Sequence, residues 1–172
     1  MISLIDDIIN LSKLDENSTQ MKMEPVDLYL ISQDVMSTLS DKAKKKNIAI
    51  TIEGDEVEVN AVPHLLFEMI YNLVDNAIKY NKVDGKIDIS VEKTQNFATL
   101  SVKDTGIGIP PEDTERVFER FYCVDKSHSK ETGGTGLGLS IVKHGAILHN
   151  AVINVESSLG IGTKITLKFN AI

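Results

Sequence analysis

Apolar residues recur along the chain at two periods, and together these predict alternating helices and strands. Spacings of three and four residues, which place side chains on one helical face, predict helices over residues 1–14, from Pro25 and Asp27 to about Asn47, from Pro63 to about Tyr80, and over Leu137–His149. Alternating apolar and polar residues predict strands over Ile48–Ile52, Glu56–Ala61, Ile87–Val91, Leu100–Val102, Val152–Glu156 and Lys164–Phe169. We expect the third and fourth strands to pair as a hairpin. Helices over one face of a largely antiparallel sheet are the natural packing of this order.

The first predicted helix differs from the rest because it is short and begins without a capping residue. We therefore expect it to be the end of a longer helical element. A polar linker from Asp15 to Glu24 follows it, and Pro110-Pro111 starts a further short helix through Phe118. We divide the chain into residues 1–22, a helix end with its linker, and residues 23–172, one compact domain.

Composition excludes several classes of function. The chain has 172 residues, of which 42% are hydrophobic, enough for one core, and a net charge of -7 argues against a nucleic-acid surface. The only basic run, Lys42 with Lys44 to Lys46, is expected to be a solvated helix end favoured by the helix dipole. The single Cys123 forms no internal disulfide, and no apolar run has the length of a membrane span or the pattern of a signal peptide.

The helix predicted after Pro63 carries an unusual polar face. Its members lie on one side at the helical period, and they are Glu68, Asn72, Asp75, Asn76 and Lys79. Asparagine is a poor helix former, so two of them one turn apart need a reason beyond local propensity. An amide oxygen joined by nucleotide phosphates suits Mg²⁺, a hard cation that keeps several waters. On its own, such a face is more typical of a solvent-exposed helix side.

The segment from Asp104 to Gly108 can read a base. An ionised carboxylate ends a predicted strand, and Gly106 and Gly108 permit a backbone path closed to other residues, so a flat ring can approach closely. As a hydrogen-bond acceptor, Asp104 would favour adenine, whose exocyclic amino group donates, over guanine, which presents a carbonyl. The alternative is an ordinary turn begun by an aspartate.

A glycine-rich segment, Gly133 to Ser140, leads directly into the last apolar helix. Its N–H groups and the positive end of the helix dipole suit phosphate oxygens. It is not a Walker A loop, because no Gly-Lys-Ser or Gly-Lys-Thr follows, and a polar loop rather than a strand precedes it, unlike a Rossmann turn. We interpret that polar stretch, Asp125 to Gly134, as a lid that orders on phosphates.

In this order, the asparagine helix, the Asp-Thr-Gly-Ile-Gly loop, Phe118-Glu119-Arg120-Phe121-Tyr122 and Gly-Thr-Gly-Leu-Gly-Leu resemble the sensor histidine kinases of two-component systems. The resemblance covers their catalytic ATP-binding domain from about Pro25 to the end of the chain, and residues 1–14 are similar to the end of their dimerisation and phosphoacceptor hairpin. It implies a Bergerat fold, an α+β two-layer sandwich whose mixed, largely antiparallel sheet is covered on one face by helices, with an N-terminal helix remnant.

The resemblance also implies roles for individual residues. Asn76 would ligate Mg²⁺, Asn72 and Lys79 would approach the phosphates, Asp104 would bind the adenine amino group, and Tyr80 would lie beside the nucleotide. The further nucleotide contacts that it implies are Gly106, Gly108, Ile109, Lys126, Gly134, Thr135, Gly136, Leu137 and Gly138. The catalytic set would be Glu68, Asn72, Lys79 and Arg120, and Phe118 and Phe121 would anchor the lid.

The reaction implied by the resemblance is transfer of the γ-phosphoryl group of ATP to a histidine, catalysed mainly by positioning and charge neutralisation. The family's acceptor histidine precedes an acidic residue and a nearby Ser-Pro or Thr-Pro, and none of His64, His128, His144 and His149 has that context. We assign these four structural roles, with dipole stabilisation sufficient near the last helix end.

We therefore expect the acceptor to lie on a hairpin domain outside this chain. The expected partners are ATP, that hairpin domain and a response regulator, in a parent protein that is a homodimer. No contact with nucleic acid or membrane is expected for these residues. The expected location is cytoplasmic, as part of a membrane-anchored parent.

Two departures from the family pattern bear on these expectations. Cys123 stands where relatives usually carry an arginine, whose planar N–H donors suit the charge of a phosphoryl group. Phosphotransfer is therefore expected to be slower unless Arg120 or Lys126 takes over the role of that arginine. Arg120 is equally compatible with a plain surface role. Gly145 replaces a bulky apolar residue, and glycine within a helix costs about 1 kcal/mol of stability relative to alanine.

Two other functions remain open. One is an ATP-binding regulatory module without kinase activity, and the other is a gyrase-like ATPase or an anti-sigma serine kinase of the same superfamily. The helix at the start of the chain speaks against the second, in which a gyrase-type ATPase would use Glu68 to activate water.

Overall fold

The computed structural model describes residues 21–124 and 135–172. The expected helix over 1–14 and lid over 125–134 lie outside these ranges. The described elements, in order, are β1 (Glu24–Asp27), α2 (Leu28–Lys45), β2 (Ala49–Gly54), β3 (Glu58–Ala61), α3 (Pro63–Lys79), β4 (Lys86–Lys93), β5 (Phe97–Asp104), the 3₁₀ turns η1 (Pro111–Asp113) and η2 (Arg116–Phe118), α5 (Gly138–Leu148), β6 (Val152–Ser158) and β7 (Gly162–Asn170).

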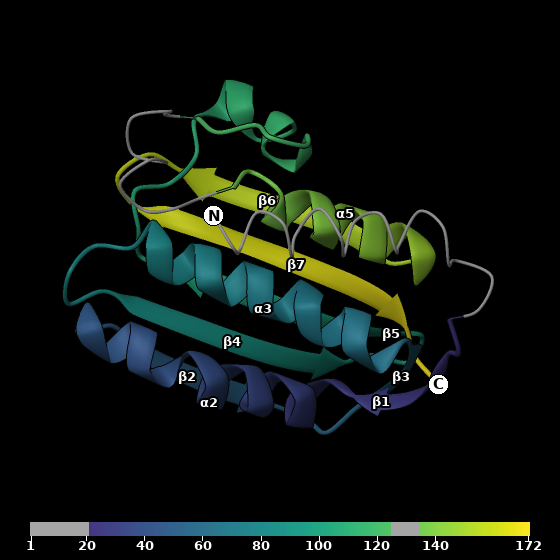
Figure 1. Cartoon of the computed structure of the whole chain (residues 1–172). Helices are drawn as coiled ribbons and strands as arrows, with labels where there is room; N and C mark the ends of the chain where they lie inside the picture. The colour runs from purple at the N-terminus through teal and green to yellow at the C-terminus, as the bar shows by residue number, and fades with distance from the viewer. Residues whose placement is uncertain (1–20, 125–134) are drawn as a thin grey trace.

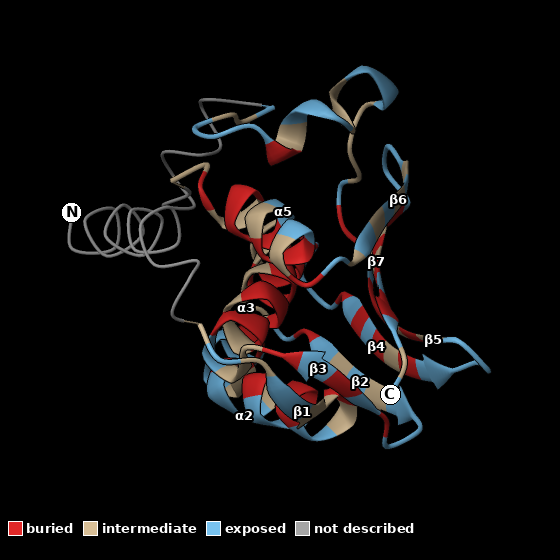
Figure 2. Cartoon of the chain, turned by 90° about the vertical axis from the view of Figure 1, so that its right-hand side faces the viewer, coloured by how far each residue is buried: buried red, intermediate tan, exposed pale blue. Residues whose placement is uncertain are grey.

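One mixed sheet and a layer of helices make up the domain (Figure 1). The sheet has the strand order β2-β4-β5-β7-β6, in which β2 pairs with β4 in parallel and the other pairs are antiparallel. Strands β1 and β3 form a separate two-stranded sheet. Helices α2, α3 and α5 all cover the same face of the larger sheet (Figures 1 and 2). The expected α+β two-layer fold is confirmed.

The core lies between these two layers, and the period of each element explains it. In β4, Ile87, Ile89 and Val91 are buried against the helices, while Lys86 before them and Asp88 between the first two are exposed. Helix α3 occupies the centre of the helical layer and buries the largest number of its own residues there (Figure 2). No helix in the described ranges combines the length and apolar character that crossing a membrane requires.

The start of α2 differs from the sequence expectation. Asp27 caps the helix as expected, since its side chain accepts a hydrogen bond from the Leu30 N–H at 2.8 Å. Pro25 does not open the helix, because it lies in β1, paired with Asn60 of β3. A proline is tolerated here because β1 pairs only with β3, and a residue whose nitrogen faces the other, unpaired edge of the strand makes no ladder hydrogen bond.

The basic run at the end of α2 is only partly solvated, which corrects the expectation that these lysines form a solvated helix end. Lys44 is exposed, but Lys46 donates from Nζ to the Ile78 and Lys79 carbonyls, at 3.0 and 2.6 Å. Lys42 forms an ion pair with Asp75 of α3. Lys46 thus binds carbonyls at the end of α3, and Lys42 and Lys46 together join α2 to α3.

Gly145 lets α5 pack closely on α3. A Cβ atom at this position would lie 2.4 Å from Sδ of Met69, a fully buried residue of α3. The methionine fills the space that a side chain on α5 would need, so the loss of helix propensity at Gly145 is offset by contact between the two helices.

His149 has a structural role, as expected, but for a different reason than the helix dipole. Its Nε2 accepts from the Val62 N–H at 2.9 Å, and its Nδ1 donates to the Gly145 carbonyl at 2.7 Å. Acceptance at Nε2 requires the neutral ring, and burial lowers the pKa of His149. The neutral imidazole therefore ties the end of α5 to the start of α3.

Candidate nucleotide site

Asp104 ends β5 with one carboxylate oxygen held and the other open. Its Oδ1 accepts from the backbone N–H of Gly106 at 2.8 Å and of Thr163 at 3.3 Å. Its Oδ2 takes no hydrogen bond from any described residue. Burial raises the pKa of Asp104, while the two N–H donors oppose that rise. A half-buried carboxylate with one open acceptor is suited to a donor on a ligand.

The loop after Asp104 packs so closely on its neighbours that glycine is required. A Cβ at Gly106 would lie 2.4 Å from the Tyr80 carbonyl oxygen at the end of α3, and a Cβ at Gly108 would lie 2.1 Å from the Ser158 carbonyl oxygen. Gly108 also has a φ of +74°, in the left-handed region. The structure therefore brings Tyr80, Gly106 and Asp104 together, as the nucleotide interpretation requires.

The turn between β6 and β7 supports this loop, which the sequence did not indicate. Gly160 N–H donates to the Ile107 carbonyl at 2.7 Å, and Ile109 N–H donates to Ser157 Oγ at 2.8 Å. A Cβ at Gly162 would lie 2.0 Å from the Asp104 carbonyl oxygen. The sequence signal for this support is the pair of glycines at 160 and 162, which lie between the two last predicted strands.

The two asparagines of α3 present their amides differently. Asn72 Nδ2 donates to the Glu68 carbonyl one turn earlier at 2.8 Å, and Asn72 Oδ1 lies 2.7 Å from where a Cβ would stand on Gly138 of α5. The half-buried Asn76 side chain makes no hydrogen bond to any described residue. The first therefore joins α3 to the start of α5, and the second offers a free amide oxygen.

Helix α5 begins at Gly138, and no side chain caps it. Its first-turn N–H groups have no partner within the helix and are suited to anionic oxygens. The Leu137 side chain is buried in the core, so only its main chain can contact a ligand. Gly136 has a φ of +71° and packs against Phe121, whose N–H donates to the Gly136 carbonyl at 2.9 Å.

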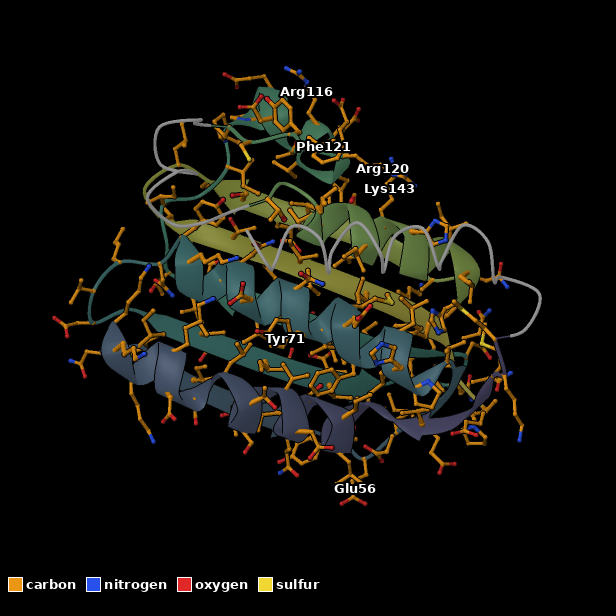
Figure 3. All side chains as sticks on the ribbon, viewed as in Figure 1. Glu56, Tyr71, Arg116, Arg120, Phe121 and Lys143 are labelled. Atoms are coloured by element: carbon orange, nitrogen blue, oxygen red, sulfur yellow. The ribbon has the colours of Figure 1, made fainter. Side chains whose placement is uncertain are left out.

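The two phenylalanines expected to anchor the lid lie in different environments. Phe118 is buried against α5, whereas Phe121 is 62% exposed and has a φ of +64°. Figure 3 shows Phe121 with Arg116 and Arg120 on the segment above α5, away from Tyr71 on α3. Arg120 is exposed, as is compatible with a surface role.

Cys123 is half-buried and free, directly after Tyr122. The Tyr122 hydroxyl donates to Asp113, a bond that raises its pKa, and the Arg116 guanidinium lies 4.3 Å from the centre of the Tyr122 ring. These contacts hold the chain in place directly before Cys123.

The remaining expected site residues are only partly placed. Lys126 and Gly134 lie outside the described ranges. Glu68 is on α3, mostly buried, with His64 Nε2 at 3.3 Å from its Oε1. Thr135 Oγ1 accepts from the Leu137 N–H at 3.4 Å.

Lys79 is not directed freely at the solvent. Its Nζ lies 2.7 Å from Oδ2 of Asp75, one turn earlier on α3, and its side chain is 21% exposed.

A groove of about 470 Å³ lies elsewhere, lined by Thr114, Glu115, Phe118, Lys143, Ile153 and Val155. It shares only Phe118 with the motifs and contains no residue of the Asp104 loop, so we do not assign the nucleotide to it.

The described residues fit a magnesium ion that is held jointly with phosphates. They contain no group of three or more histidine, cysteine, aspartate or glutamate side chains that would hold a metal alone. The Asn76 amide, without a partner in the same ranges, supplies a hard oxygen ligand of the kind that Mg²⁺ accepts beside water and phosphate oxygens.

Comparison with known proteins shows which family the chain belongs to. Residues 61–171 match the family described as histidine kinase-, DNA gyrase B- and HSP90-like ATPase. The chain belongs to this family. It is 39% identical over 168 residues to the sensor-like histidine kinase SenX3 of Mycolicibacterium smegmatis, an alignment that covers 97% of this chain and 44% of SenX3.

Solved structures agree with that assignment. The catalytic domain of histidine kinase ThkA, in a nucleotide-free form, is 28% identical with a TM-score of 0.77, and the match covers 88% of this chain and 97% of that one. Full-length ShkA in complex with AMPPNP is 25% identical with a TM-score of 0.84, over 98% of this chain and 35% of ShkA.

The expected family is thus confirmed, and the chain is an ATPase catalytic domain of the histidine kinase type. The description of the family as an ATPase supports ATP as the nucleotide that this fold binds. The chain spans less than half the length of the curated relatives it matches.

Proposed function

We propose that this domain binds ATP with Mg²⁺ between α3, the Asp104 loop and the start of α5, and transfers the γ-phosphoryl group to a histidine. The observation that carries the proposal is the Asp104 carboxylate, which keeps Oδ2 open for the adenine amino group. Similarity to ShkA, which is described in complex with AMPPNP, supports binding of an adenine triphosphate.

The phosphates are bound at the opposite end of the site from the base. Asn72 lies against Gly138, so the phosphate-facing residues of α3 meet the uncapped N–H groups of α5 there. Lys79 supplies positive charge, and Asn76 holds the Mg²⁺, which neutralises the developing charge on the phosphate oxygens. Gly106 and Gly108 let the base approach the backbone, while Leu137 acts only through its main chain.

The transfer breaks the bond between the γ-phosphorus and the β,γ-bridging oxygen and forms a bond to a histidine nitrogen, releasing ADP and one proton. Glu68, one turn before Asn72 on α3, is our candidate to accept that proton. The accepting histidine belongs to a helical hairpin domain, because no histidine of this chain has the sequence context of an acceptor.

The parent protein is then a sensor kinase. We propose that it is a homodimer, that it passes the phosphoryl group on to a response regulator, and that this domain is the cytoplasmic part of a membrane-anchored chain. The names of its relatives, which are sensor histidine kinases, support this role.

The decisive experiment incubates the chain with γ-labelled ATP, Mg²⁺ and a separately expressed hairpin domain of the parent. We expect label on a hairpin histidine, lost in the matched variant whose acceptor histidine is replaced by glutamine. ATP binding without transfer would instead indicate a regulatory module. Cys123→Arg then separates a slow catalyst from a non-enzyme, because only in a slow catalyst does the added guanidinium raise the rate.

Two further variants test neighbouring parts of the site. Asn76→Asp should change how ATP affinity depends on Mg²⁺, because it alters the charge of the proposed ligand. Robust ATP hydrolysis by the isolated chain that disappears in Glu68→Gln would contradict the kinase proposal and favour a gyrase-like ATPase.

A further inference from the structure

The proposed mechanism leaves one buried ionisable side chain of α3 unused, that of Asp75. Its side chain is 8% exposed, in the helix turn that precedes Lys79. Both of its oxygens are occupied, since Oδ2 lies 2.7 Å from Lys79 Nζ and Oδ1 accepts from Lys42 Nζ of α2. Buried carboxylates are costly unless paired, so a carboxylate here requires both lysines to stay near it.

The pair sets the direction of the Lys79 side chain. Residues four apart on a helix lie one above the other, and side chains tilt toward the helix N-terminus. The contact with Asp75 therefore draws the Lys79 ammonium back by about one turn, to the level of Asn76, which directly follows Asp75 in the chain. Asn76 is the residue to which we assign the Mg²⁺ and hence the phosphates.

The contact also limits the freedom of the ammonium. A solvated lysine loses rotamer freedom when it binds a phosphate, whereas Lys79 is only 21% exposed and already held before any ligand arrives. Its binding to phosphate is therefore less opposed by entropy.

Lys42 keeps this arrangement positively charged. A single lysine paired with Asp75 would be neutral, but two ammonium groups on one carboxylate leave a net charge of about +1. Lys42 itself is 44% exposed and comes from α2, so it compensates the carboxylate without belonging to the phosphate-facing side of α3. The carboxylate thus orients Lys79 without cancelling the attraction to phosphate.

We infer that Asp75 is a positioning residue for the nucleotide phosphates, which it serves by holding Lys79 beside Asn76. This inference rests on the proposed ATP site and adds to it the residue that prepares its cationic group.

The test compares the affinities of ATP and adenosine, measured by calorimetry in the presence of Mg²⁺, for the chain and its variants. Asp75→Asn should weaken ATP binding about tenfold, by removing a charged partner, and should leave adenosine binding within about twofold. In a Lys79→Met background, Asp75→Asn should have no further effect, because Asp75 acts through Lys79.

Two variants control for structure. Lys42→Met removes the other partner of the same carboxylate and should weaken ATP binding less than Asp75→Asn does, because Lys79 stays paired with Asp75 and only the extra positive charge is lost. Asp75→Glu, which keeps the charge, should recover most of the affinity. If Asp75→Asn does not fold, the double variant Asp75→Asn/Lys42→Met removes the unpaired ammonium as well and takes its place in the comparison.

Unchanged or tighter ATP binding in Asp75→Asn would overturn the inference, since the carboxylate would then restrain Lys79 rather than position it. An equal loss of ATP and adenosine affinity, or the same loss in the Lys79→Met background, would reduce Asp75 to a structural residue. If the unaltered chain binds neither ATP nor adenosine, the proposed ATP site itself is wrong. That outcome is observed without any variant and is therefore distinct from failure of the Asp75 inference.

Discussion

Replacing Asp104 by asparagine is the sharpest test of how the base is read. The substitution keeps the shape, and the asparagine cannot turn its amide around, because the oxygen is needed by the N–H groups of Gly106 at 2.8 Å and Thr163 at 3.3 Å. The NH₂ group then occupies the open Oδ2 position and faces the adenine amino group, donor against donor.

The expected loss follows from the bond removed. A hydrogen bond to a charged group contributes about 1.5–3 kcal/mol, which corresponds to a factor of roughly 10 to 150 in affinity. ITP, which carries a carbonyl where ATP carries the amino group, should respond in the opposite direction, because the new NH₂ group can donate to that carbonyl. The ratio of ATP to ITP affinity should therefore fall by more than ATP affinity alone.

Calorimetric titration of both nucleotides into both proteins measures this ratio, with thermal unfolding as the control. Burial raises the pKa of Asp104, so ionised Asp104 costs stability in the folded protein, and Asp104→Asn should melt no lower than the unaltered chain at pH 7. An unchanged ATP to ITP ratio in a folded variant would refute the assignment of Asp104 to the base.

The raised pKa adds a pH signature. As the pH falls toward the pKa of Asp104, the carboxylate gains a proton and its charge-assisted bond to the base weakens. ATP affinity should then decline more steeply in the unaltered chain than in Asp104→Asn. Titration of the ATP phosphates is common to both proteins and cancels in the comparison.

Three further comparisons of variants test the packing of the domain. Gly108 and Gly160 have similar φ values, +74° and +77°, but only at Gly108 would an added Cβ meet another atom. Urea unfolding should therefore show that Gly160→Ala lowers the free energy of unfolding by about 1–2 kcal/mol and that Gly108→Ala lowers it by more. Equal losses would contradict the close contact at Gly108. Gly145→Ala should destabilise the chain on its own, through collision with Met69, but stabilise a Met69→Ala variant by about 1 kcal/mol, and the same sign in both backgrounds would refute the coupling. Because burial lowers the pKa of His149 in the folded protein, the unfolded chain takes up a proton first as the pH falls. The free energy of unfolding should therefore decrease below about pH 6.5 more steeply in the unaltered chain than in His149→Gln. Parallel pH profiles would show that the neutral His149 ring does not contribute to this pH dependence.

The fold was largely predictable because its elements carry clear periods. The strands of β4 and β7 alternate, α3 has a continuous apolar stripe, and each lies within a few residues of its expected bounds. Pro25 was misjudged because a proline near a helix start is a common pattern, whereas its place in β1 depends on pairing with β3, more than thirty residues further along.

The residues of the site were named from local motifs, but their surroundings depend on tertiary contacts. The helical period put Asp75 and Asn76 on one polar face, although Asp75 is buried against Lys42 and Asn76 is not so paired. Adjacent residues on a helix differ by about 100° in direction, so the sequence alone cannot say which of two polar neighbours meets another helix. For the same reason Lys42 was assigned to a solvated run.

The base site depends on chain that never needs to touch the nucleotide. Thr163 N–H holds the Asp104 carboxylate, and Gly162 lets β7 approach the Asp104 backbone, with a hypothetical Cβ only 2.0 Å from its carbonyl oxygen. Gly162 also has a φ of +140°, so any side chain there would strain the turn and at the same time displace the Asp104 carboxylate. Lys82 Nζ, donating to the Gly160 carbonyl at 2.6 Å, joins the same turn to the end of α3. The β6–β7 turn therefore holds Asp104, the proposed base-binding residue, at a fixed position relative to the end of α3, the helix proposed to carry the phosphate ligands.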